Sequence, residues 1–276
     1  MSQRTWLVTG ASRGFGAEIA KAVLAAGDRL IATARNQTDL QQFGTSKDVL
    51  TLSMDVTDEA QVKAAIATSL EKFGQIDVLV NNAGFGLLGA IEECSAEEVE
   101  SVYRTNVFGL LNVTRAVLPS MRQHRSGHII NISSIGGYQS SPGWGIYGST
   151  KFAVEGITEA LHGELAPLGI HATVVEPGYF RTNFLDRSSL RPSAVQIPDY
   201  AQTVGKIRDV AAGLNYQQPG DPTKLGQAIL ELVNADEPPL RLPLGTDTLQ
   251  TIASKNAYVE QETAKWRALS ESTDYK

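Results

Sequence analysis

The stretch TWLVTGASRGFG, residues 5–16, decides the fold of this 276-residue chain. It begins as an apolar run of strand length and ends in three glycines, Gly10, Gly14 and Gly16, directly before a segment with helical periodicity. Glycine lets a backbone turn sharply and approach a ligand closely, and the helix N-terminus offers unpaired N–H groups to an anion. A strand, a glycine-rich turn and a helix in this order predict a site for the pyrophosphate of a dinucleotide.

Six further apolar runs of strand length follow, with helical patterns between them. The runs are RLIATA (29–34), VLTLSM (49–54), IDVLVNN (76–82), HIINIS (128–133), IHATVVEP (170–177) and PPLRLPLG (238–245). Residues 14–26, 58–73, 97–122 and 147–166 carry apolar residues at three- and four-residue intervals, as amphipathic helices do. Strands that alternate with helices predict an α/β fold of the Rossmann type, a doubly wound parallel sheet of about seven strands with helices on both faces.

The length and the continuous pattern predict one domain over residues 1–276. After Pro177-Gly178 the pattern loosens, and we expect a substrate loop over about 179–220, because long irregular segments in compact domains often serve as lids. A helix is expected after Asp221-Pro222, and a charged helical tail is expected over about 246–272.

Composition excludes several classes of function. Apolar residues make up 42% and charged residues 20% of the chain, which is typical of a globular protein and not of a disordered one. The net charge of −6 predicts no binding to nucleic acid or anionic lipid, because an acidic surface repels both. A single cysteine, Cys94, excludes an internal disulfide. With no signal-peptide pattern and no apolar stretch of about 18 residues, we expect a cytoplasmic protein that does not enter a membrane.

The cofactor preference follows from charge at the end of the second apolar run. Enzymes that use NAD generally place an acidic residue there, to bind the ribose 2′-hydroxyl. Here the run ends at Ala34, followed by Arg35, and Arg13 stands within the glycine turn. Two guanidinium groups favour a 2′-phosphate, because arginine binds phosphate oxygens in a bidentate fork. The pattern therefore predicts NADP(H) rather than NAD(H), unless both arginines are solvated surface groups.

Tyr147 and Lys151, in YGSTK, are four residues apart at the start of a predicted helix, so both side chains lie on one face. A phenol has a pKa of about 10, and a neighbouring ammonium favours the phenolate. Such a pair suits a proton donor and acceptor that works near neutral pH. Ser134, after HIINIS, adds a hydroxyl for a carbonyl oxygen that gains negative charge. The alternative for the pair alone is a half-buried ring beside a solvated amine.

The motifs form an ordered set: TGASRGFG (9–16), NNAG (81–84), Asn106 in TNVFG, Ser134, Tyr147, Lys151 and Pro177-Gly178. In order and spacing this set resembles the short-chain dehydrogenase/reductase family, over residues 5 to about 182. The resemblance implies an NADP(H)-dependent oxidoreductase that transfers a hydride between the nicotinamide and a carbonyl carbon, or takes it from a secondary alcohol in the reverse direction.

The resemblance also implies a role for each matching residue. Tyr147 is expected to be the acid/base, and Lys151 to lower its pKa and bind the nicotinamide ribose. Ser134 is expected to orient the substrate, with Ser133 one residue out of register, and Asn106 to hold a water of a proton relay. The residues expected to bind the cofactor are Gly10, Ser12, Arg13, Gly14, Phe15, Gly16, Arg35, Asp55, Val56, Asn82, Ala83, Gly84, Tyr147, Lys151, Pro177, Gly178 and Thr182.

The substrate pocket is expected between residues 136–144 and 179–190. The residues expected to bind substrate are Ser134, Trp144, Tyr147, Phe180 and Phe184. Aromatic walls predict a hydrophobic ketone, aldehyde or secondary alcohol, unless the aromatic rings only pack within the loop. A substrate with an anionic group stays open because of Arg181, Arg187 and Arg191. No metal is expected, since His124, His128, His162 and His171 lack ligand spacing.

Members of this family commonly dimerise through the helix that carries the tyrosine and the helix before it. The apolar positions on these two helices, which suit either such a face or burial against the sheet, are Leu110, Val113, Val117, Ile157, Leu161 and Leu165. We expect a homodimer, with a tetramer as the alternative. Two other functions stay open: a 3-oxoacyl-thioester reductase, which should carry a basic docking patch, and a non-catalytic NADP-sensing regulator, which should have lost the tyrosine or the lysine. A structural module has no reason to keep either site.

Overall fold

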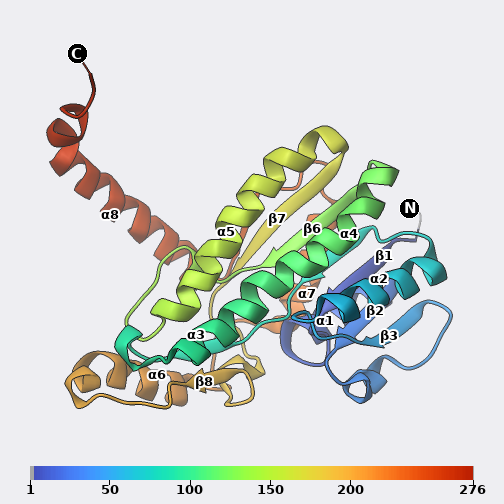
Figure 1. Ribbon diagram of the computed structural model, residues 1–276, viewed down its shortest axis with the longest axis horizontal. Helices are drawn as coiled ribbons and strands as arrows, with labels where there is room; N and C mark the ends of the chain where they lie inside the picture. The colour runs from blue at the N-terminus through green and yellow to red at the C-terminus, as the bar shows by residue number, and fades with distance from the viewer. Residues whose placement is uncertain (1–2, 276) are drawn as a thin grey trace.

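The computed structural model describes residues 3–275, and its centre is a parallel sheet of seven strands (Figure 1). The spatial order is β3-β2-β1-β4-β6-β7-β9, so the chain begins in the middle, builds one edge and then crosses to build the other. The strands are β1 (Thr5–Thr9), β2 (Arg29–Ala34), β3 (Val49–Ser53), β4 (Val78–Asn81), β6 (Gly127–Ile132), β7 (Ile170–Pro177) and β9 (Arg241–Leu244). This topology confirms the predicted α/β fold and places a crevice beyond β1 and β4, where the order reverses.

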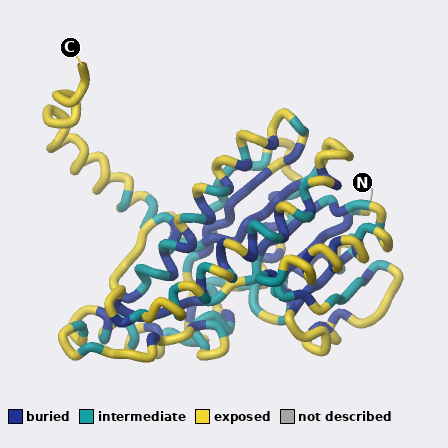
Figure 2. Tube along the Cα trace, viewed as in Figure 1, coloured by how far each residue is buried: buried dark blue, intermediate teal, exposed yellow. Residues whose placement is uncertain are grey.

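Helices cover both faces of the sheet, and alternate residues of each strand reach different cores. Trp6 and Val8 of β1 pack with α1 (Gly14–Ala25) and α7 (Pro222–Asn234). Leu7 lies in the opposite core, beneath α2 (Glu59–Phe73), α4 (Leu110–His124) and α5 (Gly145–Leu165). Figure 2 shows the strands buried between these helices. Burial on both faces explains why the strands read as unbroken apolar runs.

The helix predicted over 97–122 is divided. The structure has α3 (Ala96–Tyr103), a π-helical segment η3 (Arg104–Gly109) and then α4. The pattern did not reveal this interruption, because apolar spacing changes little when one turn widens. Such π segments often occur at functional sites, and this one contains Asn106.

The segment expected as a substrate loop, 179–220, is largely folded. Its strand β8 (Leu190–Pro192) pairs in parallel with β5 (Gly86–Leu88), the strand that follows the NNAG motif. Leu88, Leu190 and Ala211 form a small separate core. The elements of the segment are η6 (Asn183–Leu185), β8, η7 (Pro198–Tyr200), η8 (Ala201–Gly205) and α6 (Lys206–Leu214). The segment is thus a second small layer beside the main sheet (Figure 1).

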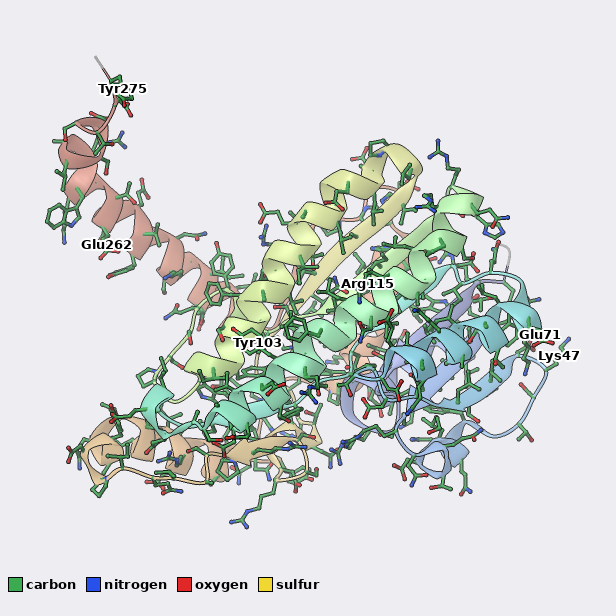
Figure 3. The ribbon with its side chains drawn as sticks, in the orientation of Figure 1. Lys47, Glu71, Tyr103, Arg115, Glu262 and Tyr275 are labelled. Atoms are coloured by element: carbon green, nitrogen blue, oxygen red, sulfur yellow. The ribbon has the colours of Figure 1, made fainter. Side chains whose placement is uncertain are left out.

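Short helices complete the body, and a long one leaves it. Besides η6 and η7, the 3-10 helices of the described residues are η1 (Gln37–Phe43), η2 (Ile91–Glu93), η4 (Ile135–Gly137) and η5 (Ala166–Leu168). Helix α8 (Thr246–Glu271) starts against the body and projects outward, with Glu262 and Tyr275 on the projecting part (Figures 1 and 3). Residues 256–275 are all exposed.

The apolar residues expected on α4 and α5 pack into the cores of the protein itself. Leu110, Val113, Val117, Leu161 and Leu165 lie in the cores beneath these helices. The large apolar side chains left exposed nearby are Phe108 and Phe152. Within residues 3–275 no helix combines the length and the apolar character needed to cross a membrane.

Candidate active site

A cavity of about 470 Å³ lies at the carboxyl ends of the strands, between the glycine turn and the segment 179–220. Its wall includes every residue expected to bind the cofactor except Gly16, and every residue expected to bind substrate. Three of the four expected catalytic residues, Ser134, Tyr147 and Lys151, also line it, whereas Asn106 does not. Residues from six regions of the chain therefore meet at the edge where open α/β sheets bind ligands.

The glycine turn is shaped by close packing against the end of β4. Gly10 has a φ of +63°, a conformation that glycine adopts without strain. A Cβ on Gly16 would lie 2.4 Å from the Gly10 oxygen and 2.5 Å from Asn82 Nδ2. Asn82 Nδ2 itself donates to the carbonyl oxygens of Thr9 (2.9 Å) and Gly10 (3.1 Å). Gly16 thus stands behind the turn and not on the cavity wall, and its missing side chain allows the turn to close.

Arg13 and Arg35, the two arginines expected near a 2′-phosphate, differ in their contacts. Arg13 Nη2 donates hydrogen bonds to the Ser188 carbonyl oxygen (2.7 Å) and to Ser189 Oγ (3.0 Å). The Arg35 guanidinium lines the same cavity, and in the described part of the chain it has neither a hydrogen bond nor an ion pair. Arg35 is therefore the arginine that is free to meet a phosphate.

Tyr147 is buried at the start of α5, between the rings of Trp144 (centroids 5.7 Å apart) and Phe184 (5.4 Å). Burial raises the pKa of Tyr147 above its ordinary value, a hydrogen bond with Ser134 lowers it, and Tyr179 raises it further. Ser134 Oγ also accepts a hydrogen bond from the Gly136 N–H, at 3.0 Å, which orients the hydroxyl. The Tyr147 phenol and the Ser134 hydroxyl thus lie together as polar groups among aromatic side chains.

Lys151 lies one turn after Tyr147, as its spacing predicts, and its Nζ is 5.7 Å from the Tyr147 ring centroid. The ammonium donates to the Ile132 carbonyl oxygen at 2.8 Å. Burial lowers the pKa of Lys151 to about 8, while the charge of Glu155 opposes that shift. Burial dominates the pKa of Tyr147 in this structure, so the expected lowering of that pKa by Lys151 stays a prediction.

Asn106 is buried behind the cavity wall. Its Nδ2 donates to the Phe85 carbonyl oxygen (2.9 Å) and to Thr150 Oγ1 (3.1 Å), and its Oδ1 accepts from the Phe85 N–H (3.1 Å). A Cβ on Gly84 would lie 3.0 Å from Asn106 Oδ1 and 3.9 Å from Lys151 Nζ. Asn106 therefore holds the chain after NNAG in place beside Lys151.

The Pro177-Gly178 turn is held from the C-terminal side of the chain. Gly178 N donates to the Leu244 carbonyl oxygen (3.0 Å), and Tyr179 N donates to Asp247 Oδ2 (2.7 Å). A Cβ on Gly178 would lie 2.2 Å from that carboxylate. No local pattern in the sequence points to Asp247, since nothing links the first turn of α8 to residues about 70 positions earlier.

The aromatic residues expected to bind substrate separate into two groups. Trp144 and Phe184 flank Tyr147, whereas Phe180 packs edge-on against Phe15 of the glycine turn, with centroids 5.4 Å apart. The structure adds Phe85, whose ring carries the Arg191 guanidinium 4.1 Å from its centroid. Other wall residues outside the segments expected from the sequence are Met54, Thr57, Ser101, Arg104, Thr105, Ile135 and Gln218. Phe85 could have been found, because it follows NNAG directly, whereas the place of the others depends on how separate elements pack.

Metal ligands do not gather in this part of the molecule. Across residues 3–275 no three or more His, Cys, Asp or Glu side chains lie close enough together to hold an ion. His128 is buried on β6, and burial lowers its pKa to about 3, so its ring is neutral.

Comparison with known sequences gives one family. The profile of the short chain dehydrogenase family matches residues 4–192. The oxidoreductase BOA17 of Botryotinia fuckeliana is 38% identical over 271 residues, which cover 97% of this chain and 98% of that protein. A 3-ketodihydrosphingosine reductase of Bacteroides thetaiotaomicron is 39% identical over 246 residues, 89% of each chain.

Comparison with solved structures agrees. A short-chain dehydrogenase from Streptomyces avermitilis is 41% identical, covers 99% of each chain and superposes with a TM-score of 0.92. A short chain dehydrogenase/reductase from Burkholderia phymatum in complex with NAD is 25% identical over 95% of each chain, with a TM-score of 0.83. ElxO with NADP bound is 28% identical over 90% of this chain and 100% of that one, with a TM-score of 0.74.

Proposed function

Because the chain belongs to the short-chain dehydrogenase family and is an NAD(P)-dependent oxidoreductase, we propose that it uses NADP(H) to interconvert a hydrophobic ketone or aldehyde with its alcohol. The observation that carries this proposal is the meeting of Ser134, Tyr147 and Lys151 on one wall of the cavity. A phenol, a hydroxyl and a buried ammonium at one point are what a carbonyl oxygen needs when it gains charge and a proton.

The residues present fit a dinucleotide. The turn at Gly10 and Gly16 leaves no room for side chains, so its backbone is open to a pyrophosphate at the N-terminus of α1. The other residues expected to bind the cofactor, apart from Gly16, line the same cavity, and Tyr147 lines it as well. When bound there, the cofactor supplies the hydride for reduction or accepts it in oxidation.

The protein's own groups handle the proton. In the reductive direction Tyr147 Oη donates its proton to the carbonyl oxygen, while the Ser134 hydroxyl hydrogen-bonds to that oxygen as its negative charge grows. The Lys151 ammonium stabilises the phenolate that remains on Tyr147. In the oxidative direction the phenolate accepts the alcohol proton. The aromatic rings of Trp144 and Phe184 around Tyr147 exclude water from this exchange.

The preference for NADP(H) over NAD(H) rests on Arg35. This guanidinium is on the cavity wall and follows Ala34, where an acidic residue would repel a phosphate. Similar structures contain NAD in one case and NADP in another, so the family alone does not decide the cofactor. Charge at this position supports the phosphorylated form.

A hydrophobic substrate is supported by Trp144 and Phe184, which flank Tyr147, and by Phe85 and Leu185, which line the same cavity. The Bacteroides relative is named for reducing a keto compound, 3-ketodihydrosphingosine. The presence of Ser134, Tyr147 and Lys151 together argues against a regulator that only senses the cofactor.

We also propose a homodimer that works in the cytoplasm. The exposed rings of Phe108, in η3 just before α4, and of Phe152, on α5, offer an apolar face for a second copy. The single free thiol of Cys94 suits a reducing compartment. Light scattering in solution tests the assembly.

The experiment for the proposed function replaces the phenol. A panel of hydrophobic ketones and aldehydes, from acetophenone and benzaldehyde to long-chain 3-ketones, is followed by NADPH absorbance. Tyr147→Phe should lower kcat by about 10² to 10⁴-fold with NADPH affinity unchanged. Tyr103→Phe is the matched control. The hydroxyl of Tyr103, which Figure 3 labels, donates a hydrogen bond to Ser149 Oγ (2.8 Å), and neither residue lines the cavity. Full activity in Tyr147→Phe would reject the assignment.

A further inference from the structure

Two carboxyl groups are buried behind the active-site wall. Glu155 of α5 is 6% exposed and Glu176 of β7 is 0% exposed. Among the described residues, none of their four oxygens has a hydrogen-bond partner. The nearest cation is Arg241 of β9, whose Nε lies 3.4 Å from Glu155 Oε2 and 3.6 Å from Glu176 Oε1. One guanidinium thus faces two carboxyl groups across the carboxyl ends of the strands.

One cation cannot balance two buried negative charges. Removing a carboxylate from water costs several kcal/mol unless an opposite charge or hydrogen bonds compensate for it, and two neighbouring carboxylates repel each other. Burial, and then the charge of Glu155, raise the pKa of Glu176 to about 7. Burial also raises the pKa of Glu155. Both carboxyl groups are therefore protonated more readily than an exposed glutamate, and the single facing cation favours one negative charge on the pair.

The pair is next to the catalytic groups. Glu155 follows Lys151 by four residues on α5, so both side chains are on the same face of the helix. Ser133, next to Ser134 in the chain, has its hydroxyl near Glu155, because a Cβ on Gly137 would be 2.4 Å from Ser133 Oγ and 3.1 Å from Glu155 Oε1. Burial lowers the pKa of Lys151, and Glu155 is the charge that opposes this. Without that charge the lysine has no counterion among its near neighbours.

Other charged or titratable groups around the pair come from each neighbouring element. They are Lys151 and Glu159 on α5, Arg241 on β9, Tyr138 after η4, and Lys255 and Glu260 on α8. Arg241 also pairs with Glu159, at 3.0 Å. Glu159 is largely exposed and so contributes a screened charge.

We propose that Glu155 and Glu176 share one proton, and that Glu155 acts as a positioning residue by placing the remaining negative charge beside Lys151 so that its ammonium keeps its proton. Glu176 and Arg241 fix how much of that charge Glu155 carries. The role of Lys151 as the cation behind Tyr147 rests on the proposed function, but its charge state can be measured without turnover.

The direct test is the titration of Lys151 itself. Protein labelled with ¹³Cε-lysine is titrated by NMR between pH 6 and 10, and the Lys151 signal is assigned by its loss in Lys151→Arg. Glu155→Gln removes the nearer carboxylate and should lower the Lys151 midpoint by about one pH unit. Glu176→Gln leaves the charge on Glu155, so its midpoint should equal or exceed that of the wild type. Glu155→Asp keeps a charge and should restore most of the shift.

A double variant keeps the test valid if one buried charge disturbs folding. Glu155→Gln/Glu176→Gln leaves no buried carboxyl group in the pair, and Arg241 keeps its contact with Glu159. Its Lys151 midpoint should fall at least as far as in Glu155→Gln. An unchanged Lys151 midpoint in Glu155→Gln or in the double variant overturns the proposal. Equal shifts of that midpoint in Glu155→Gln and Glu176→Gln also overturn it.

Activity gives a second readout. With NADPH and the fastest ketone of the panel, the active form holds a proton on both Tyr147 and Lys151, so removing a nearby negative charge makes loss of either proton easier. The alkaline decline of kcat should therefore move to lower pH in Glu155→Gln and stay in place in Glu176→Gln. If Tyr147→Phe remains active, the proposed function fails, whereas the NMR result decides the carboxyl pair by itself. A kcat that falls with no change in the alkaline decline indicates only a structural role and counts against the inference.

Discussion

The guanidinium of Arg13 donates a hydrogen bond to the carbonyl oxygen of Ser188, with Nη2 and the oxygen 2.7 Å apart. The two residues are 175 positions apart in the chain, one in the glycine turn and the other in the segment that carries Phe184. Both also line the cavity. The glycine turn on one side of the cavity is thus tied directly to the segment 179–220 on the other.

Loss of this tie should loosen the substrate wall. Arg13→Met removes the bonds to Ser188 and Ser189, so amide hydrogen exchange over residues 184–192 should become faster and the KM for the carbonyl substrate should rise roughly threefold to tenfold. Arg187→Met is the control, because Arg187 is exposed in the same segment and does not line the cavity. Equal exchange in both variants would show that Arg13 does not restrain the segment.

Arg35 should decide between the two cofactors. Arg35→Asp replaces an unpaired guanidinium with a carboxylate, which repels a 2′-phosphate and can bond a 2′-hydroxyl. The NADPH-to-NADH ratio of kcat/KM should fall by about 2 kcal/mol, or roughly 30-fold. Steady-state kinetics with both cofactors measures it, and an unchanged ratio would remove Arg35 from the phosphate site.

The glycine turn should tolerate no side chain at Gly16. In Gly16→Ala the new Cβ meets the Gly10 oxygen at 2.4 Å, so the turn must shift, at a cost of about 1–3 kcal/mol, and dinucleotide affinity should fall with it. Gly163→Ala is the control, since nothing lies within 4 Å of the added Cβ on helix α5. Alanine there should stabilise the protein by about 0.5–1 kcal/mol. Chemical denaturation and cofactor titration measure both, and intact binding in Gly16→Ala would contradict the close packing.

The buried carboxyl pair should make stability depend on pH. The pKa of Glu176 in the folded protein, about 7, is above its ordinary value of 4.5. Its contribution to stability is therefore complete below about pH 4.5 and is lost as pH rises through 7. The free energy of unfolding of the wild type should fall on the order of 2 kcal/mol between pH 5 and pH 8 from this group.

Glu176→Gln should remove most of that decline. Glu159→Gln should keep it, because Glu159 contacts the same arginine from an exposed position. Urea unfolding at several pH values distinguishes the two variants. Parallel declines in the wild type and Glu176→Gln would mean that Glu176 is ionised throughout this range.

Local signals in the sequence determined most of the fold. Strands buried on both faces appear as apolar runs wherever they lie in the chain, so all seven strands of the main sheet could be found, and with them the edge where the site forms. Gly10, Gly14 and Gly16 mark a turn that few other residues permit. Tyr147 and Lys151 lie on one helix, so their spacing alone brings them together.

Only the tertiary structure decided which distant residues meet. The pairing of β5 with β8, the contact of Arg13 with Ser188, the hold of Asp247 on the Pro177-Gly178 turn and the meeting of Glu155 with Glu176 each join residues from separate elements. Apolar periodicity shows which side of an element is buried but not which element covers it. Partner choice depends on how the layers pack in space. For that reason the sequence could point to the residues that we propose as catalytic, while the structure was needed to show which side chains and charges surround them.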